Sequence, residues 1–286
     1  MEPEYLVLLS DLDPVAGALR ERWGVPPSIG EFVDGAPLRR LSEHALVLSR
    51  PGHHIHDERV DRRLPDGWQR RPLTLVFPSI HRSERNVECL TVHPLGNPGL
   101  HAEVGGRPRT FSPTDPPRMT ALLRALAERG PALGWSATFE ATHHGPEVGR
   151  PAFFVEIGYG EVPEPPPAAV GLLAETIPFV EPVAGDRIAL GVGGGHYVPH
   201  FTELAVRRRW SFGHLISRHA LPSLDAESAR AAWAATPGAE GVLYARAEDE
   251  TAGRWSELAP RLRDGDAPRR DPGDRATSAS RPASGT

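Results

Sequence analysis

The sequence predicts an α/β protein, because apolar runs of strand length alternate with helical segments along most of its 286 residues. The chain opens with such a pair: Tyr5–Ser10 is predicted as a buried strand, and Asp13 begins a helix that runs to about Trp23. Hydrophobic residues are only 39% of the chain, and 31 prolines account for part of that low value. We expect a single α/β domain over residues 1–262 and a disordered tail, rich in Pro, Arg, Ser and Gly, over residues 263–286.

Apolar runs predict three further strands in the N-terminal third of the chain: His44–Ser49, Leu73–Phe77 and Cys89–Val92. The stretch before the first of them, residues 24–43, is predicted as a proline-rich loop. The second and third strands are followed by His81 and His93. Open α/β sheets hold their active sites at the carboxyl ends of strands, so we expect both imidazoles at one edge of the sheet.

The remaining elements alternate in the same way. The helix Met119–Arg129 has apolar residues at helical spacing and ends at Gly130-Pro131. Four further strands are predicted, at Ser136–Thr142, Ala152–Ile157, Asp186–Leu190 and Gly241–Ala245. Three further helices are predicted: Ala168–Thr176, a helix that carries the arginine run Arg207-Arg208-Arg209, and Ala226–Ala235.

Missing residue types exclude several chemistries. All 32 basic residues are arginines, so Schiff-base catalysis and a lysine-containing phosphate loop are excluded. Cys89 is the one cysteine, and its apolar neighbours predict a buried strand residue. Disulfides within the chain and cysteine-based zinc clusters are therefore excluded, and His, Asp and Glu would have to hold any metal, as in catalytic sites.

Charge and hydropathy restrict the partners and the cellular location that the sequence predicts. The net charge of −5 argues against a general nucleic-acid coat, although local arginine patches can still bind phosphates. No apolar stretch approaches the roughly 18 residues of a membrane helix, and the N-terminus does not resemble a targeting signal. We expect a soluble, cytoplasmic protein.

A histidine-rich segment follows the strand His44–Ser49. On a strand His54 and His56 would share a face, as a metal-binding pair could. The H-x-H-x-D-H pattern of the metallo-β-lactamase fold is not met, because Glu58 follows Asp57 where a histidine is required. An exposed polar loop is the expectation here, and metal binding is the alternative.

Three later segments carry candidate site residues. Glu156 stands inside an apolar strand, so its carboxylate must be paired, bound to metal or raised in pKa, unless it faces water at a sheet edge. His143 and His144 are adjacent, and on an extended backbone they diverge. The run Gly193-Gly-Gly-His-Tyr197 puts an imidazole and a phenol beside bare backbone, which indicates a site, with a silent strand-to-helix turn as the alternative.

Taken together, four segments resemble the D-aminoacyl-tRNA deacylases of the archaeal and plant type, over about residues 4–221. They are Ser79-Ile-His-Arg-Ser83 with Leu90-Thr-Val-His-Pro-Leu-Gly-Asn97, Ala141-Thr-His-His-Gly-Pro146, Phe154-Val-Glu-Ile-Gly158, and Gly193-Gly-Gly-His-Tyr-Val-Pro199 with Phe201-Thr202. The chain departs from the family pattern at Glu84-Arg85, Tyr159 and His200. The resemblance implies a three-layer α/β/α fold with a mixed central sheet, distantly similar to phosphorylase and peptidyl-tRNA hydrolase folds.

The resemblance also implies a zinc-dependent hydrolase that cleaves the ester between a D-amino acid and tRNA, acting as a monomer or homodimer. The candidate catalytic residues are His81, His93, His143, Glu156 and His196; His93, His143, His196 and Glu156 are the candidate zinc ligands. The candidate substrate-binding residues are Arg82, Ser83, Thr142, His144, Gly194, Gly195, Tyr197, Arg207 and Arg208. The alternatives are a metal-dependent hydrolase of small D-aminoacyl esters or amides, a ligand-binding homologue without activity, and an acyl-enzyme mechanism through Ser83.

Overall fold

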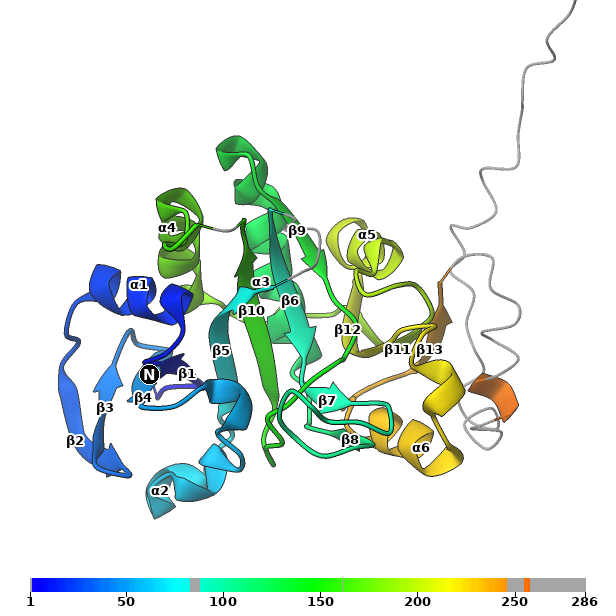
Figure 1. Ribbon diagram of the computed structural model, residues 1–286, viewed down its shortest axis with the longest axis horizontal. Helices are drawn as coiled ribbons and strands as arrows, with labels where there is room; N and C mark the ends of the chain where they lie inside the picture. Colours follow the sequence, from blue (N-terminus) through cyan, green and yellow to red (C-terminus); the bar gives the residue numbers. More distant parts are fainter. Residues whose placement is uncertain (1, 83–87, 161, 246–254, 258–286) are drawn as a thin grey trace, which may run out of the picture.

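The computed structural model describes residues 2–82, 88–160, 162–245 and 255–257, and the predicted tail at 263–286 lies outside them. Its centre is an eight-stranded sheet, beside which a smaller three-stranded sheet packs (Figure 1). The order of the large sheet is β2 (Ser28–Val33), β3 (Ala36–Arg40), β4 (Ala45–Arg50), β1 (Tyr5–Ser10), β5 (Thr74–His81), β10 (Ala152–Gly158), β6 (Cys89–Pro94) and β9 (Ser136–Phe139). The small sheet has the order β12 (Trp210–Ile216), β11 (Arg187–Val192), β13 (Gly241–Tyr244), and β7 (Gly96–Asn97) pairs with β8 (Thr110–Phe111).

Helices cover both faces of the large sheet. One face packs against α1 (Pro14–Trp23), α3 (Pro116–Arg129) and α4 (Pro167–Thr176). The opposite face is covered by short helices, α2 (Asp66–Gln69) and the 3-10 turns His54–His56 and Val60–Arg63. Two longer helices flank the small sheet, α5 (Pro199–Arg207) and α6 (Ala226–Ala234), and further 3-10 turns lie at Gly130–Leu133, Ile177–Phe179 and Leu221–Ser223. The predicted α/β class with a mixed central sheet is confirmed.

The two sheets share one hydrophobic core. Phe139 at the end of β9 contacts Phe212 of β12 edge to face, and Phe201 of α5 packs on the same ring. All three are fully buried and belong to the cluster that also contains the apolar sides of α1, α3 and α4. Packing across both sheets therefore fixes β9 and the chain that follows it against β12. Within the described residues, no helix is both long enough and apolar enough to span a bilayer.

Strand directions differ from the sequence expectation. β5 and β10 are parallel, but β6 is antiparallel to β10, and β9 runs with β6. The carboxyl ends of β5 and β6 therefore lie at opposite edges of the sheet, so the expectation that His81 and His93 share one edge was wrong. Both imidazoles instead lie on the same face, within strands that extend further than predicted.

Two strand predictions were incomplete. Residues 24–43, expected as a loop, contain the β2–β3 hairpin, whose turn is Asp34-Gly35 with φ angles of 49° and 82°. An Asp-Gly pair with left-handed backbone is a common hairpin turn and was the overlooked signal. The strand β12 was also missed, and it begins at Trp210 directly after the arginine run. Of that run only Arg207 lies in a helix.

The histidine segment after β4 is partly buried: His53 and His56 are exposed, as expected, but His54 is not. His54 lies in a 3-10 turn and is 3% exposed, with its ring against Phe77 and Phe154. Its Nε2 lies 4.0 Å from Asp13 Oδ2. Tertiary packing over the sheet therefore buries one histidine of an otherwise partly exposed polar segment.

Asp13 fixes the end of β5. Its Oδ1 accepts from the backbone N–H groups of Val15 and Ala16 and so caps α1. Its Oδ2 accepts from the Ser79 hydroxyl at 2.8 Å and from the Ile80 N–H at 3.0 Å. One buried carboxylate thus joins the start of α1 to the residues immediately before His81.

Candidate active site

The site lies on the face of the large sheet that carries the short helices. Glu156 of β10 is paired with Ser79 of β5 and Thr91 of β6, so side chains two residues further along these strands share its face. That spacing puts His81 and His93 on the same face. Glu140, one residue after β9, continues the β6–β9 register opposite His93. Four strands thus place two imidazoles and two carboxylates together.

Three histidine rings are in mutual contact, with centroids 4.4–4.8 Å apart: His93, His143 and His144. Each Nδ1 lies within hydrogen-bonding distance of a backbone carbonyl: His93 with Pro94 at 3.3 Å, His143 with Ala141 at 2.8 Å and His144 with Gly145 at 2.7 Å. Because a carbonyl oxygen only accepts, each Nδ1 carries a proton, and in the neutral form of each ring the Nε2 lone pair is left for another partner. Metal-binding histidines are commonly oriented in this way.

The two carboxylates are fully enclosed and bonded to imidazoles. Glu140 is 0% exposed, with Oε1 3.1 Å from His81 Nδ1 and Oε2 3.2 Å from His196 Nε2. Glu156 Oε2 lies 3.3 Å from His81 Nδ1, and its Oε1 lies 3.6 Å from His93 Nε2. Burial opposes ionisation, but the facing imidazoles outweigh it, chiefly His196 for Glu140 and His81 for Glu156. The pKa of Glu140 is lowered to about 2, and that of Glu156 is lowered as well.

The histidines fall into two electrostatic groups. Burial lowers the pKa of His143 well below its usual value and that of His144 to about 4, and neighbouring imidazoles add to the effect. For His81 and His93, burial is outweighed by the bonded carboxylates, and the pKa of each is raised. Two neutral imidazoles thus adjoin two that interact directly with carboxylates.

The mouth of the site is formed by residues 193–197, which we call the glycine loop. His196 is 44% exposed at its side chain, and its ring stacks over His81. The hydroxyl of Tyr197 lies 2.8 Å from His81 Nε2. Gly193 and Gly194 have φ angles of 105° and 79°, which L side chains rarely adopt, so the loop conformation requires glycine there. The loop therefore exposes His196 and turns Tyr197 inward.

The small sheet holds the histidine-bearing loop after β9. The Thr142 N–H donates to the Leu215 carbonyl, and the Thr142 hydroxyl oxygen accepts from the Leu215 N–H. His214 Nε2 lies 2.9 Å from the Ser112 carbonyl, so that nitrogen carries the proton. His214 Nδ1 then accepts from the Thr142 hydroxyl at 3.0 Å. The Thr142 side chain, predicted to bind substrate, is 2% exposed and has both hydrogen-bonding functions occupied.

Close glycine packing completes this loop. A Cβ on Gly145 would lie 2.3 Å from the Gly106 nitrogen, and a Cβ on Gly105 would lie 1.7 Å from the Ile55 carbonyl oxygen. The Glu58 carboxylate accepts from the N–H groups of Gly106 and Glu147. Three backbone segments therefore meet at glycines directly beside His144.

The predicted site residues divide into those that converge and those that do not. His81, His93, His143, His144, Glu156, His196 and Tyr197 come together. Gly194 and Gly195 lie in the loop at the mouth, Arg82 is exposed just after β5, and Ser83 lies outside the described residues. Arg207 and Arg208 lie at the C-terminal end of α5, whose nine residues span about 13 Å from the glycine loop.

Glu140 was missed by sequence reasoning. It stands between Phe139 and Ala141 at the end of an apolar strand, which is the same signal that identified Glu156. The residues present fit a metal ion, because the Nε2 of His93 and both oxygens of Glu140 are buried without a hydrogen-bond partner that satisfies them. Ligand atoms of three overlapping groups lie within 4.8 Å of one another: His93, His143 and His144; His81, Glu140 and His196; and His93, Glu140 and Glu156.

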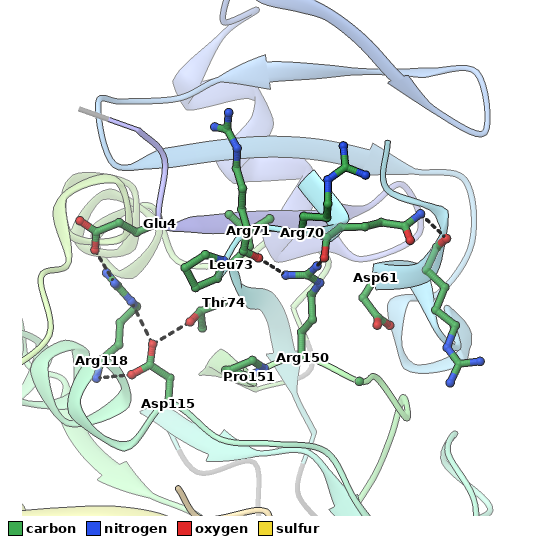
Figure 2. Close-up of a pocket in the computed structure, with 14 residues that line it drawn as sticks. Glu4, Asp61, Arg70, Arg71, Leu73, Thr74, Asp115, Arg118, Arg150 and Pro151 are labelled. Atoms are coloured by element: carbon green, nitrogen blue, oxygen red, sulfur yellow. Dashed lines mark hydrogen bonds and ion pairs between the residues drawn. The ribbon is translucent and has the colours of Figure 1, made fainter. Parts of the chain in front are cut away.

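A cavity of about 770 Å³ lies away from this cluster, at the opposite end of β5, where Thr74 begins the strand (Figure 2). Two of its arginines already have protein partners. Arg118 bonds Glu4, Asp115 and the Val180 carbonyl, and Arg150 bonds backbone carbonyls at the end of α2. These guanidinium groups stabilise the fold, and the histidine–carboxylate cluster is the stronger candidate site.

The fold and site define an α/β protein with a buried histidine–carboxylate centre. Residues 69–259 match the family described as D-aminoacyl-tRNA deacylase. The curated D-aminoacyl-tRNA deacylase of Methanoregula boonei is 43% identical over 79% of this chain and 49% of its own, and that of Pyrococcus horikoshii is 35% identical over 67% and 72%. The chain belongs to the D-aminoacyl-tRNA deacylase family.

A solved structure has the same fold. The crystal structure of a conserved protein of unknown function superimposes with a TM-score of 0.78 at 26% identity, covering 91% of this chain and 94% of that one. The chain spans about half the length of some curated relatives, 49% for Methanoregula boonei and 44% for Methanosphaerula palustris.

Proposed function

We propose that this protein hydrolyses the ester bond of D-aminoacyl-tRNA and releases the free D-amino acid and tRNA. The relatives in its family are named for this activity. The observation that carries the proposal is the convergence of ring nitrogen atoms from His93, His143 and His144, within 4.8 Å of one another, beside the buried carboxylates Glu140 and Glu156. Such a donor set is typical of metal-assisted hydrolysis.

Zinc is the cofactor we propose, because neutral imidazole and carboxylate are among its usual ligands. His93, His143 and His144 would hold it, with Glu156 as an oxygen donor beside His93. When bound, zinc polarises an ester carbonyl and lowers the pKa of a coordinated water. The group of His81, Glu140 and His196 shares no residue with the first group, and Glu140 and His93 connect the two through the third group. The metal content of the protein therefore distinguishes one ion from two.

The protein's own groups would bind the ester and move protons. His196 is exposed at the mouth and bonded to Glu140, which suits it to give a proton to the departing ribose hydroxyl. Tyr197, bonded to His81, would orient the aminoacyl group. The bare backbone at Gly194 and Gly195 allows the terminal nucleotide to approach closely. Steric and hydrogen-bond mismatch in this enclosed site would reject the L-enantiomer.

The test is deacylation of D-tyrosyl-tRNA and L-tyrosyl-tRNA by metal-depleted protein, before and after zinc is restored. We expect the D-ester alone to be cleaved, with activity lost on depletion and regained with zinc. Equal cleavage of both esters, or activity unaffected by depletion, would contradict the proposal.

Metal binding has its own readout in thermal unfolding. Zinc at 100 times its Kd should stabilise the protein by about 2.7 kcal/mol, which is roughly 5–10 °C for a domain of this size. His143→Ala should lose this shift, while His101→Ala, at an exposed position outside the cluster, should keep it. A full zinc-dependent shift in the Tm of His143→Ala would show that His143 is not a zinc ligand.

A further inference from the structure

Three arginines act electrostatically on one carboxylate, Glu147, which follows the histidine-bearing loop. Arg107 donates to both oxygens of Glu147, at 2.7 Å from Nη2 to Oε1. The hydrogen bond from Arg107 is the largest cause of a lowered Glu147 pKa, and the charges of Arg59 and Arg62 lower it further. All three guanidinium groups are therefore within electrostatic reach of the same carboxylate. We call Arg59, Arg62 and Arg107 the arginine cluster.

The cluster is fixed to the site by backbone contacts. Glu147 lies three residues after His144, so the two Cα atoms are at most about 11 Å apart. The Arg59 N–H donates to the Glu147 carbonyl, and the Glu147 N–H donates to Glu58. The segment that carries Arg59 and Arg62 therefore cannot move independently of the loop that carries His143 and His144.

The positive charge of the cluster is not balanced by its neighbours. Arg59 and Arg62 are exposed, and in the described part of the chain no carboxylate forms an ion pair with either. The Glu58 oxygens are occupied by two backbone N–H groups, and Asp57 pairs with Arg50 and Arg63. Glu147 and Glu58 together offset three guanidinium groups, which leaves a local excess of one positive charge on a chain of net charge −5.

We propose that the arginine cluster binds backbone phosphates of the tRNA close to the aminoacylated 3′ end. The proposal rests on the proposed function, because the ester to be cleaved is the last bond of that strand. Guanidinium groups match phosphate geometry, and exposed unpaired arginines lose little hydration energy on binding it. A length of about 11 Å from His144 is within reach of the last nucleotides of a strand whose end lies in the site.

The experiment measures binding of uncharged tRNA against salt concentration for the full chain. Arg59→Gln with Arg62→Gln should weaken binding and reduce the slope of log Kd against log salt by about 1.4, since each single-strand phosphate contact contributes about 0.7. Glu147→Gln should tighten binding, because it removes the negative charge that pairs directly with Arg107. Arg207→Gln with Arg208→Gln removes the same charge at the far end of α5 and should leave the slope near the wild-type value.

Two results would overturn the proposal. One is an unchanged slope in the Arg59/Arg62 variant together with a reduced slope in the Arg207/Arg208 variant, which would place the phosphates at α5. The other is an equal loss of D-tyrosine methyl ester hydrolysis and tRNA binding in the Arg59/Arg62 variant, which would indicate a disturbed centre. Wild-type protein that binds tRNA through these arginines but cleaves no D-ester would refute the proposed function alone.

Discussion

The hydrogen-bonded link between Thr142 and His214 gives the sharpest test of how the site is held. Thr142→Val keeps the shape of the side chain but removes its hydroxyl. The change leaves His214 Nδ1 and the Leu215 N–H, both fully buried, without their partner. Each orphaned group costs about 1–3 kcal/mol, so we expect a loss of about 3 kcal/mol in the free energy of unfolding. That corresponds to a decrease of about 6–12 °C in Tm.

The assay is thermal and urea unfolding of metal-free protein, with kcat measured in parallel on protein to which zinc has been restored. Thr142→Ser retains the hydroxyl and should lie within about 1 kcal/mol of wild type. Thr142→Val combined with His214→Leu removes both partners, so its destabilisation should be smaller than the sum of the single changes by about 1–2 kcal/mol. If Thr142→Val were as stable as Thr142→Ser, or if the two changes were additive, the deduced hydrogen-bond arrangement would be refuted.

Three further changes test the supports of the site. Gly145→Ala should lower Tm and kcat together, because its Cβ would lie 2.3 Å from the Gly106 nitrogen. Gly17→Ala is the control: it lies inside α1 with open space around it, so it should raise the free energy of unfolding by up to about 1 kcal/mol in the same assay. Asp13→Ala should lower the free energy of unfolding in urea by about 2–3 kcal/mol and should lower kcat. The change removes the cap of α1 and the hydrogen bonds that hold the end of β5. An unchanged kcat would show that other contacts fix this strand end. Burial lowers the pKa of His214 from 6.5 to about 4, so as the pH falls the unfolded chain binds the proton first. The free energy of unfolding should therefore decrease by about 3 kcal/mol between pH 6.5 and pH 4. His214→Leu should remove this part of the pH dependence, and an unchanged profile would contradict it.

Local patterns predicted much of the chemistry. His81, His93, His143, Glu156 and His196 were all identified by residue type and neighbouring sequence, and the structure brings them together. Polar titratable side chains at the ends of apolar strands are unusual enough to stand out in a single sequence. Glu140 carried the same signal and was overlooked beside the two histidines that follow it.

Strand direction was beyond the reach of the sequence. An apolar run such as Cys89–Val92 has the same pattern whether it pairs parallel or antiparallel, so the reversal of β6 was invisible. The burial of His54 was also hidden, because it depends on Phe77 and Phe154, which come from strands later in the chain. Both outcomes depend on pairings between distant segments.

The sequence by itself determined the α/β class, the residue types of the site and the exclusion of lysine and cysteine chemistry, because these follow from local composition and periodicity. Tertiary structure decided which nitrogen atoms are available, since the backbone carbonyls that hold each Nδ1 fix the tautomers of His93, His143 and His144. It also gave Thr142 its partner in His214, 72 residues later. Hydrogen bonds between such distant residues depend on the packed arrangement of two sheets, which no local pattern encodes.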